Sequence, residues 1–310
     1  MRRFTAVLCV ALGAVSHAPC LEPPGSVIPL LRVHGGMPVV AVRVRDTILR
    51  LALDTGTSRT LVSARAAARL GVTPTEAFVL ASVAGAPRTG LCGPVGDLRV
   101  GRVSLTIPCI GWVPSWSEWG DGSAIDGLLG ADALSATAAL IDTRHGIVRL
   151  APARSLAPWV EGVRLPLERI GRRLAVRVEV PAVGPRVDAR MVLDSGADGV
   201  VLFGDVGRRA AATAAVRRAT GRLSSGNAGR SVRLLSLGTV RVGHLDLDAG
   251  TAGVIPEPGP NGEDGLLPLH LLGPVLLDMS AGVLVAQARL RSAPSPVTAS
   301  VAIRDAAAGR

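Results

Sequence analysis

The sequence predicts an all-β protein built from two similar lobes, and both its composition and an internal repeat point to this fold class. The 310 residues are enough for two domains of ordinary size, each with its own hydrophobic core. Apolar residues make up 48% of the chain, beside 37 glycines and 22 prolines, as is typical of a globular protein rich in strands and turns. Tyrosine is absent and aromatic residues contribute only 2%, so valine, leucine, isoleucine and alanine must fill the cores.

The internal repeat centres on two short segments, 51–62 and 191–202. In each, an apolar run leads to an aspartate, a small hydroxyl residue and a glycine, and the chain then turns apolar again (Asp54-Thr55-Gly56 and Asp194-Ser195-Gly196). An aspartate between apolar flanks is costly to bury unless its surroundings stabilise it. One such tripeptide would also fit a strand that ends in an Asp turn. Two copies in matching contexts indicate a duplication.

The repeat extends well beyond the two tripeptides. The apolar segments 125–134 and 263–272 follow at similar distances, with 73 residues from Asp54 to Gly127 and 71 from Asp194 to Gly265. Each segment leads to further apolar strands, at 140–148 and 276–284. Alternating valines precede each aspartate: Val40, Val42 and Val44 in the first copy, Val176, Val178 and Val180 in the second. The period is too long for a solenoid, so we predict a duplicated domain.

These paired motifs resemble those of the aspartic protease superfamily. Each half resembles a retropepsin subunit, and the fused pair resembles the two lobes of a pepsin-like enzyme. The resemblance covers nearly all of the chain between an N-terminal leader (residues 1–18) and a C-terminal tail (residues 291–310). It implies a bilobal acid-protease fold of two homologous β-barrel-like lobes with short helices. We therefore expect an N-terminal lobe at 19–155 and a C-terminal lobe at 156–290.

The resemblance implies an aspartic endopeptidase with Asp54 and Asp194 as its catalytic dyad. Two adjacent carboxyls that share one proton can activate a water and also donate to the scissile carbonyl, a chemistry for which aspartic proteases are themselves the standard example. No metal or organic cofactor is expected. The substrate would be a peptide or protein, bound extended in the cleft, with apolar residues flanking the cut. The protein would act as a monomer, an internal pseudo-dimer.

Residues around the dyad acquire supporting roles from the same resemblance. Thr55 and Ser195 would reach across the lobe interface and bond to each other's loops, while Gly56 and Gly196 would leave room for the carboxyls. Thr57 could donate to the outer oxygen of Asp54, whereas its counterpart Ala197 cannot, which would make the two carboxyls inequivalent. The predicted substrate-binding flap tips are Gly85 and Ala86 in the first half, and Asn227 and Ala228 in the second.

Two features depart from the family pattern. Pro268 stands where the first repeat has Gly130, so the supporting loop of the second lobe must differ locally. The absence of tyrosine excludes the flap residue typical of pepsins and leaves retropepsin-like flaps. These departures keep open an alternative function, that of a catalytically silent, protease-like peptide-binding protein of the cell envelope.

Other patterns indicate no second kind of site. The sequence lacks Gly-x-Ser-x-Gly, His-Glu-x-x-His, a phosphate loop and a Cys/His metal cluster. The net charge of +10 comes from scattered arginines without interleaved aromatics, which argues against nucleic-acid binding. Envelope binding through these arginines has only the charge behind it. We interpret the following residues as structural: His34, His145, His244 and His270, and the recurring Asp126, Asp142, Asp264 and Asp278.

The two ends of the chain read as segments outside the lobes. Residues 1–18 have a charged start, an apolar stretch and a small-x-small site, which predicts a signal peptide and an exported protein, periplasmic or secreted. An uncleaved anchor is the alternative. The last segment, 291–310, is rich in alanine, serine and proline without an apolar period, and we expect it to be disordered.

Several local patterns make further predictions. Alternation over Val39–Leu49 indicates a half-buried strand, Ser63–Leu70 a short helix capped by Ser63, and 207–220 a second helix. Cys92 and Cys109 lie nearly opposite each other in an expected hairpin, as either a disulfide or two buried thiols; we predict the disulfide. Three tryptophans form either a satellite core or an apolar wall for substrate: Trp112, Trp116 and Trp119.

Overall fold

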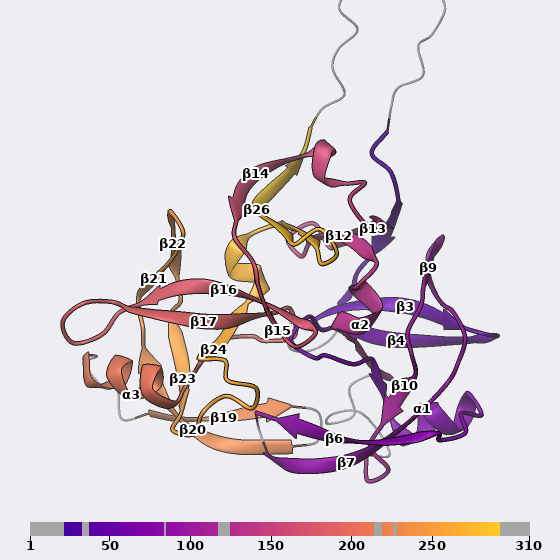
Figure 1. The fold of residues 1–310 in the computed structure, drawn as a ribbon, viewed down its shortest axis with the longest axis horizontal. Helices are drawn as coiled ribbons and strands as arrows, with labels where there is room; N and C mark the ends of the chain where they lie inside the picture. The colour runs from indigo at the N-terminus through magenta and orange to yellow at the C-terminus, as the bar shows by residue number, and fades with distance from the viewer. Residues whose placement is uncertain are drawn as a thin grey trace, which may run out of the picture. The chain divides into compact units, whose positions relative to one another are not determined.

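The computed structural model describes residues 22–32, 37–83, 85–116, 125–213, 219–225 and 228–291. The predicted leader, and the predicted tail from residue 292 on, lie outside these ranges. Residues 24–291 form one compact unit. Strands dominate this unit and helices are few and short, which confirms the predicted all-β class (Figure 1).

Each half of the chain builds its own large sheet. In the described part of the first half, ten strands contribute: β6 (Glu76–Ser82), β7 (Gly85–Gly93), β10 (Ile110–Trp112), β5 (Leu61–Val62), β11 (Gly127–Leu129), β4 (Thr47–Leu53), β3 (Pro38–Val44), β8 (Leu98–Val100) and β9 (Val103–Leu105), with β2 (Leu31–Arg32) beside β3. Strand β4 thus lies between the antiparallel β3 and the parallel β11.

The second half repeats this order. Its described strands are β19 (Ala219–Ser225), β20 (Ala228–Ser236), β23 (Thr251–Ile255), β18 (Val200–Phe203), β24 (Gly265–Pro268), β17 (Val187–Asp194), β16 (Arg173–Val180), β21 (Thr239–Val242) and β22 (Leu245–Asp248), with β15 (Glu168–Ile170) beside β16. Strand β17 lies between the antiparallel β16 and the parallel β24, as β4 does between β3 and β11. The two dyad strands therefore occupy equivalent central positions.

A third sheet joins the halves. Its six strands in the described ranges are β1 (Ser26–Pro29), β13 (Ile147–Pro152) and β12 (Thr137–Asp142) from the first half, and β25 (Val275–Asp278), β26 (Val283–Leu290) and β14 (Val160–Leu165) from the second. The central antiparallel pairing, β12 with β25, crosses from one half to the other. Buried apolar residues of both halves also form one continuous core.

Two predicted elements differ in their extent. The alternation over Val39–Leu49 spans a hairpin rather than one strand, because the chain turns at Arg45 and Asp46, with Arg45 at φ 52°. The two-residue turn shifts the phase of the alternation: Val42 and Val44 are buried on β3 and Leu49 on β4, whereas Ile48 is exposed. The predicted helix 207–220 is α3 (Gly204–Thr213), and residues 219–220 begin β19 instead, where they pair with Leu234 and Arg233. Strand pairing thus overrides the helical propensity of alanine and arginine.

The remaining helices are short. Helix α1 (Ala64–Arg69) begins as predicted at Ser63, whose Oγ accepts a hydrogen bond from the Ala66 N–H. Helix α2 (Ala131–Leu134) and the 3-10 turns η1 (Ala157–Trp159) and η2 (Leu269–Leu272) complete the described set. No helix in the described ranges has the length and apolar character needed to cross a membrane.

Candidate active site

Asp54 and Asp194 lie at the ends of the two central strands. Strand β4 ends at Leu53, directly before Asp54, whereas Asp194 is the last residue of β17. The apolar residues before them are buried in the sheets, and glycine follows two positions later, so each chain leaves its sheet in a tight loop. These loops bring the two carboxyls close together, since a Cβ at Gly196 would lie 3.1 Å from Cγ of Asp54 and 3.3 Å from Oδ1 of Asp194.

Backbone N–H groups hold both carboxyls. Oδ1 of Asp54 accepts from the N–H groups of Gly56 at 2.9 Å and Thr57 at 3.1 Å, and Oδ1 of Asp194 accepts from the Gly196 N–H at 2.8 Å. Glycine is required at position 56, because a Cβ there would lie 2.4 Å from Cγ and Oδ2 of Asp194. At Gly196 the nearest atom to such a Cβ would be Cγ of Asp54, at 3.1 Å.

The hydroxyls of Thr55 and Ser195 interlock the two loops. The Thr55 N–H donates to Ser195 Oγ at 3.0 Å, and the Ser195 N–H donates to Thr55 Oγ1 at 3.1 Å. Each hydroxyl then donates onward to the opposite strand, Thr55 to the Leu193 carbonyl at 2.8 Å and Ser195 to the Leu53 carbonyl at 2.7 Å. Four hydrogen bonds thus fix the two aspartate loops relative to each other, as the sequence resemblance implies.

The two carboxyls differ in their electrostatic surroundings. Burial raises the pKa of Asp54 well above its usual range and the neighbouring Asp194 raises it further, while the N–H groups of Gly56 and Thr57 oppose this. Burial also raises the pKa of Asp194, against four influences that lower it: the Gly196 and Ala197 N–H groups, the Asp54 side chain and the positive charge of Arg173. The two carboxyls therefore titrate as a pair, and Arg173 acts on the Asp194 side of that pair.

The origin of this asymmetry differs from the one predicted. Thr57 contacts Asp54 through its backbone N–H, and the backbone N–H of Ala197 acts on Asp194 in the same way. A hydroxyl is not needed for either. Arg173, at the start of β16, is the unsymmetrical group: it is buried, Nη2 pairs with Glu263 Oε1 at 3.0 Å, and Nη1 lies 3.5 Å from the Gly56 carbonyl oxygen. Sequence reasoning missed both members of this pair, whose positions carry no motif.

The loops that support the two aspartates also differ, as Pro268 led us to expect. In the first half, Gly130 packs against the Arg59 backbone, and a Cβ there would lie 2.5 Å from the Arg59 carbonyl carbon. Buried Asp132 then accepts from the Thr60 N–H at 2.8 Å and the Thr60 hydroxyl at 2.7 Å. In the second half Pro268 continues β24 opposite Asp194, and the exposed His270 stands in the place of Asp132.

The recurring aspartates serve the strands. Asp126 Oδ2 accepts from the Arg50 N–H at 2.9 Å, and Asp264 Oδ2 from the Arg190 N–H at 2.8 Å, so the two copies tie the same position of each half to its dyad strand. Asp142 and Asp278 accept N–H groups in the turns after β12 and β25. These contacts agree with the structural interpretation of the four residues.

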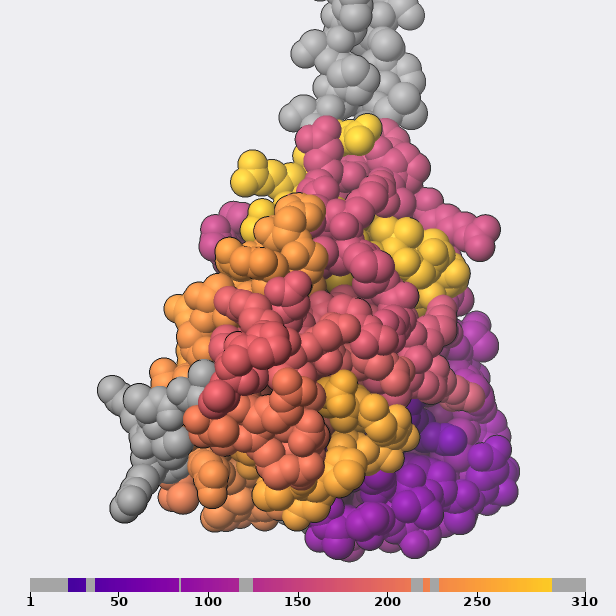
Figure 2. Space-filling view, turned by 60° about the vertical axis from the view of Figure 1, so that its left-hand side comes forward, coloured from indigo at the N-terminus to yellow at the C-terminus, as the bar shows by residue number. Residues whose placement is uncertain are grey.

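The flap hairpins are β6–β7 and β19–β20. Strands β7 and β20 contact each other, and Figure 1 shows the two hairpins side by side. Gly85 and Ala86 begin β7 and are exposed; Asn227 lies outside the described residues, and Ala228 begins β20. On the face in Figure 2, segments of the second half lie directly against segments of the first.

Two apolar clusters lie next to the dyad strands and contact the flaps. One contains Ala52, Trp116 and Ile125, with Phe78 and Leu80 of β6 packed against it. The other contains Val192, Val201 and Phe203 of the second half, and Val83 from the turn of the first flap packs against it. Trp112 and Trp116 are 8% and 3% exposed, so both belong to the core, as in the first of the two interpretations. Trp119 lies outside the described residues.

A disulfide joins the base of the first flap to the strand beside it. Cys92 in β7 is bonded to Cys109, just before β10, with the Cα atoms 5.7 Å apart. The Arg59 guanidinium lies against both sulfurs, 3.0 and 2.8 Å away, and over the Phe78 ring at 4.7 Å. Among the described residues, Glu76 with these two cysteines is the one group that could hold a metal, but the disulfide already uses both sulfurs.

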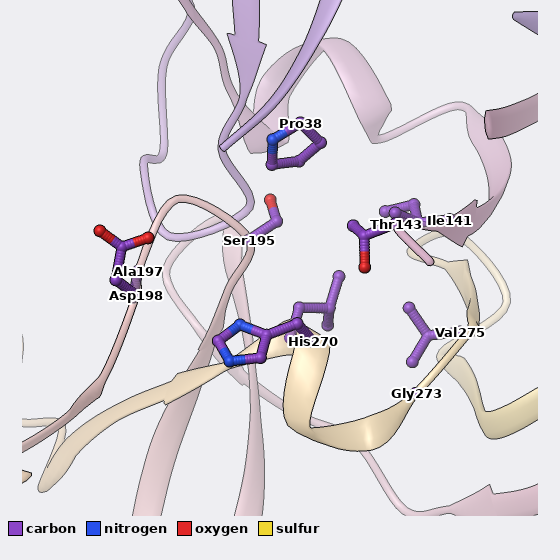
Figure 3. Close-up of a pocket in the computed structure, with 10 residues that line it drawn as sticks. Pro38, Ile141, Thr143, Ser195, Ala197, Asp198, His270, Gly273 and Val275 are labelled. Atoms are coloured by element: carbon purple, nitrogen blue, oxygen red, sulfur yellow. The ribbon is translucent and has the colours of Figure 1, made fainter. Parts of the chain in front are cut away.

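Two cavities border the aspartate loops. Figure 3 shows the one beside Asp194, of about 290 Å³, between Ser195, Pro38, the end of β12 and η2. Asp198 stands at its edge, where burial raises its carboxyl pKa and nearby His270 opposes this. The other cavity, about 330 Å³, lies beside the Asp54 loop and is lined by Ser58, Arg59, Ile170, Gly171, Arg172, Arg173 and Asn261.

The fold and this paired site define an aspartic-protease-like protein, and comparison with known proteins agrees. A family model for aspartyl proteases matches residues 40–133 and 176–271, one segment in each half. The chain belongs to the aspartyl protease family.

Among solved structures, that of the aspartic proteinase from Irpex lacteus matches with a TM-score of 0.54. The match covers 87% of this chain and 99% of that one. At 14% identity this likeness concerns the fold alone. A comparison with curated proteins finds no match.

Proposed function

We propose that this protein is an aspartic endopeptidase in which Asp54 and Asp194 activate one water molecule for attack on a peptide bond. The carrying observation is the pair of adjacent carboxyls at the ends of two equivalent strands, each held by backbone N–H groups. Membership of the aspartyl protease family supports the same reaction class.

The two carboxyls share one proton and divide the roles between them. The ionised aspartate removes a proton from the water, whose oxygen attacks the scissile carbonyl carbon. The protonated aspartate donates a hydrogen bond to the carbonyl oxygen and stabilises the charge that develops there. When the C–N bond breaks, the proton taken from the water passes to the leaving nitrogen. The interlocked hydroxyls of Thr55 and Ser195 keep both carboxyls in place.

We further propose that the substrate is an extended peptide with apolar residues flanking the cut. Extended peptides bind by pairing their backbone with strand edges while alternate side chains fill pockets. The two apolar clusters support this preference, because Ala52 and Val192 each stand two residues before a dyad aspartate and both clusters reach the flaps.

The test is digestion of a denatured protein mixture at several pH values, with and without pepstatin, by the parent, Asp54→Asn, Asp194→Asn and the double variant. Each single substitution should abolish cleavage, because one carboxyl cannot both deprotonate water and donate to the carbonyl. The two losses should not add, since a single change already removes the dyad. The mapped cuts of the parent should lie between apolar residues.

Three results would contradict this proposal. Cleavage retained by either single variant would mean that the two aspartates do not act together. Uniform cutting after basic residues would refute the substrate preference. A folded parent that cuts nothing at any pH would favour the catalytically silent peptide-binding protein.

A further inference from the structure

The cavity beside the Asp54 loop is lined by hydroxyl and arginine residues that the proposed dyad reaction does not use. Ser58 and Arg59 come from the loop that follows Asp54, while Arg172 and Arg173 come from the start of β16 in the second half. The Arg173 guanidinium reaches the Gly56 carbonyl oxygen, so the cavity wall touches the dyad loop itself. Figure 1 places β15, just before this turn, next to the strands of the first half.

The polar groups that line this cavity are mainly hydrogen-bond donors. Ser58, Asn261 and three arginines are among the lining residues, and no aspartate or glutamate is. The guanidinium groups of Arg59 and Arg173 are engaged with the disulfide sulfurs and with Glu263. Two acids near these arginines are already engaged. Glu263 pairs with Arg173 and accepts from the Asn261 N–H at 3.0 Å, and Glu76 lies 3.6 Å from Cys92 Sγ.

Arg172 supplies a positive charge without an internal partner. It stands in the two-residue turn between Ile170 and Arg173, where Gly171 adopts φ +61°, and it is exposed. Within the described ranges no carboxylate forms an ion pair with Arg172 or with Arg59, whereas eight other arginines do. An arginine fork that faces a cavity suits a carboxylate ligand, which it can bind through two parallel N–H groups.

The equivalent position in the other half has the opposite chemistry. Ser58 stands four residues after Asp54, and Asp198 stands four residues after Asp194. Asp198 borders the other cavity, so a carboxyl occupies the place that a hydroxyl occupies here. The duplication thus places a cationic cavity beside one aspartate and an acidic side chain beside the other. A peptide that crosses both loops would meet different charges on the two sides of its scissile bond.

We infer that the cavity lined by Ser58, Arg59 and Arg172 is a subsite for a substrate carboxylate on one side of the scissile bond. This inference rests on the proposed peptidase function and names a substrate class for it: peptides with an apolar pair at the cut and an acid nearby. The carboxylate belongs either to an aspartate or glutamate side chain or to the C-terminus of the peptide. Both sources offer the same group to Arg172.

The experiment uses acetylated, amidated octapeptides with an apolar central pair. Glutamate, glutamine or lysine is placed in turn at each outer position. At one position on one side of the cut, glutamate should raise kcat/KM over glutamine by about two- to fivefold, the gain expected of an ion pair with an exposed arginine. Lysine should lower it, and added salt should reduce the preference. A parallel series with a free C-terminal acid and no glutamate tells a terminal carboxylate from a side chain.

Variants of Arg172 test whether this cavity causes the preference for glutamate. Arg172→Gln should bring the glutamate-to-glutamine ratio near one, and Arg172→Glu should make lysine the better residue. Arg99→Gln, at an exposed arginine on β8, is the matched control and should keep the parent ratio. A parent that cuts the glutamine and glutamate series equally would overturn the subsite and leave the peptidase standing. A preference that survives in Arg172→Gln would also overturn it.

A peptide-binding measurement tests the carboxylate subsite even if the proposed peptidase activity fails. If the parent cuts nothing, fluorescence anisotropy with labelled glutamate and glutamine peptides still reports on the cavity. Tighter binding of the glutamate peptide, lost in Arg172→Gln, supports a carboxylate subsite in a silent binding protein. Equal binding of the two peptides refutes it.

Discussion

At the scale of single residues, the candidate active site must hold two carboxyls side by side, although both are negative when ionised. Gly56 and Gly196 allow the approach because neither carries a Cβ in the space between the carboxyls. The N–H groups stabilise ionised oxygens, but burial outweighs them at both aspartates, and at Asp54 the charge of Asp194 adds to it, so the folded pKa of both is raised. The pair therefore reduces stability whenever both members are forced to ionise.

This conflict predicts how stability depends on pH. For a carboxyl whose folded pKa is raised above its unfolded value of about 3.9, the folded state keeps its proton longer than the unfolded state. The stabilising contribution is full below that unfolded value and is lost as the pH rises through the raised folded pKa. Each unit of elevation corresponds to about 1.4 kcal/mol. The unfolding free energy of the parent should thus decline over this window.

Asp54→Asn should flatten that decline, since the amide removes both the titration and the like charge. At neutral pH the variant should melt at or above the temperature of the parent. Urea denaturation of parent and variant at pH 3 and pH 7 measures the difference. An equal pH dependence in the two proteins would show that the carboxyl pair does not cause it.

At the scale of elements, the interlocked loops show how two short segments position a dyad. Each loop leaves a strand held on both sides, β4 between β3 and β11, and β17 between β16 and β24. The hydroxyls of Thr55 and Ser195 convert these two separately anchored loops into one unit through hydrogen bonds to the opposite backbone. Thr55 is 3% exposed, so its partners have no water to replace it.

Thr55→Val should therefore lower the unfolding free energy by about 1–3 kcal/mol, the cost of leaving a buried donor and acceptor unsatisfied. Cleavage should fall as well, because the carboxyls lose their alignment. Thr55→Ser is the matched control: it keeps the hydroxyl, as Ser195 does in the second copy, and should retain most of both properties. Denaturant melts and peptide cleavage report the two effects. A Thr55→Val protein as stable and active as Thr55→Ser would exclude this role.

At the scale of the whole molecule, two similar halves joined in one chain supply both aspartates of the dyad. The six-stranded sheet takes three strands from each half, and β12 pairs directly with β25. Ala139 and Ile141 of β12 and Leu277 of β25 belong to the core that runs through both halves. A half on its own would expose an apolar edge strand, and such edges associate with other strands.

We expect that neither half is active alone, and that coexpression of segments 22–155 and 156–291 restores part of the activity. Each half brings one carboxyl, and pairing of β12 with β25 brings the two together. Size-exclusion chromatography and peptide cleavage of the separate and combined halves test this. Asp194→Asn in the second segment should abolish the restored activity. Activity of the first segment alone would mean that it forms its own paired site.

The sequence predicted best those features whose residues lie close together in the chain. The dyad aspartates, the hydroxyls and the glycines belong to two tripeptides, and the preceding alternation predicts the strands that carry them. The cap at Ser63 depends on neighbouring residues in the same way. At Arg45 and Asp46 the prediction missed a turn, because apolar residues alternate on both sides of it and only the buried positions shift from even to odd.

The sequence by itself determined the class of this protein, its duplication and the residues of its dyad, because these follow from short motifs and their spacing. Only the tertiary structure decided which charged groups stand beside the dyad and where the cationic cavity lies. Arg173 and Glu263 are 90 positions apart, and they meet beside Asp194 because β16, β17 and β24 are neighbours in one sheet. Arg59 and Arg172 likewise line one cavity although they come from different halves. No local pattern records such contacts, because their free energy depends on distances that strand pairing sets.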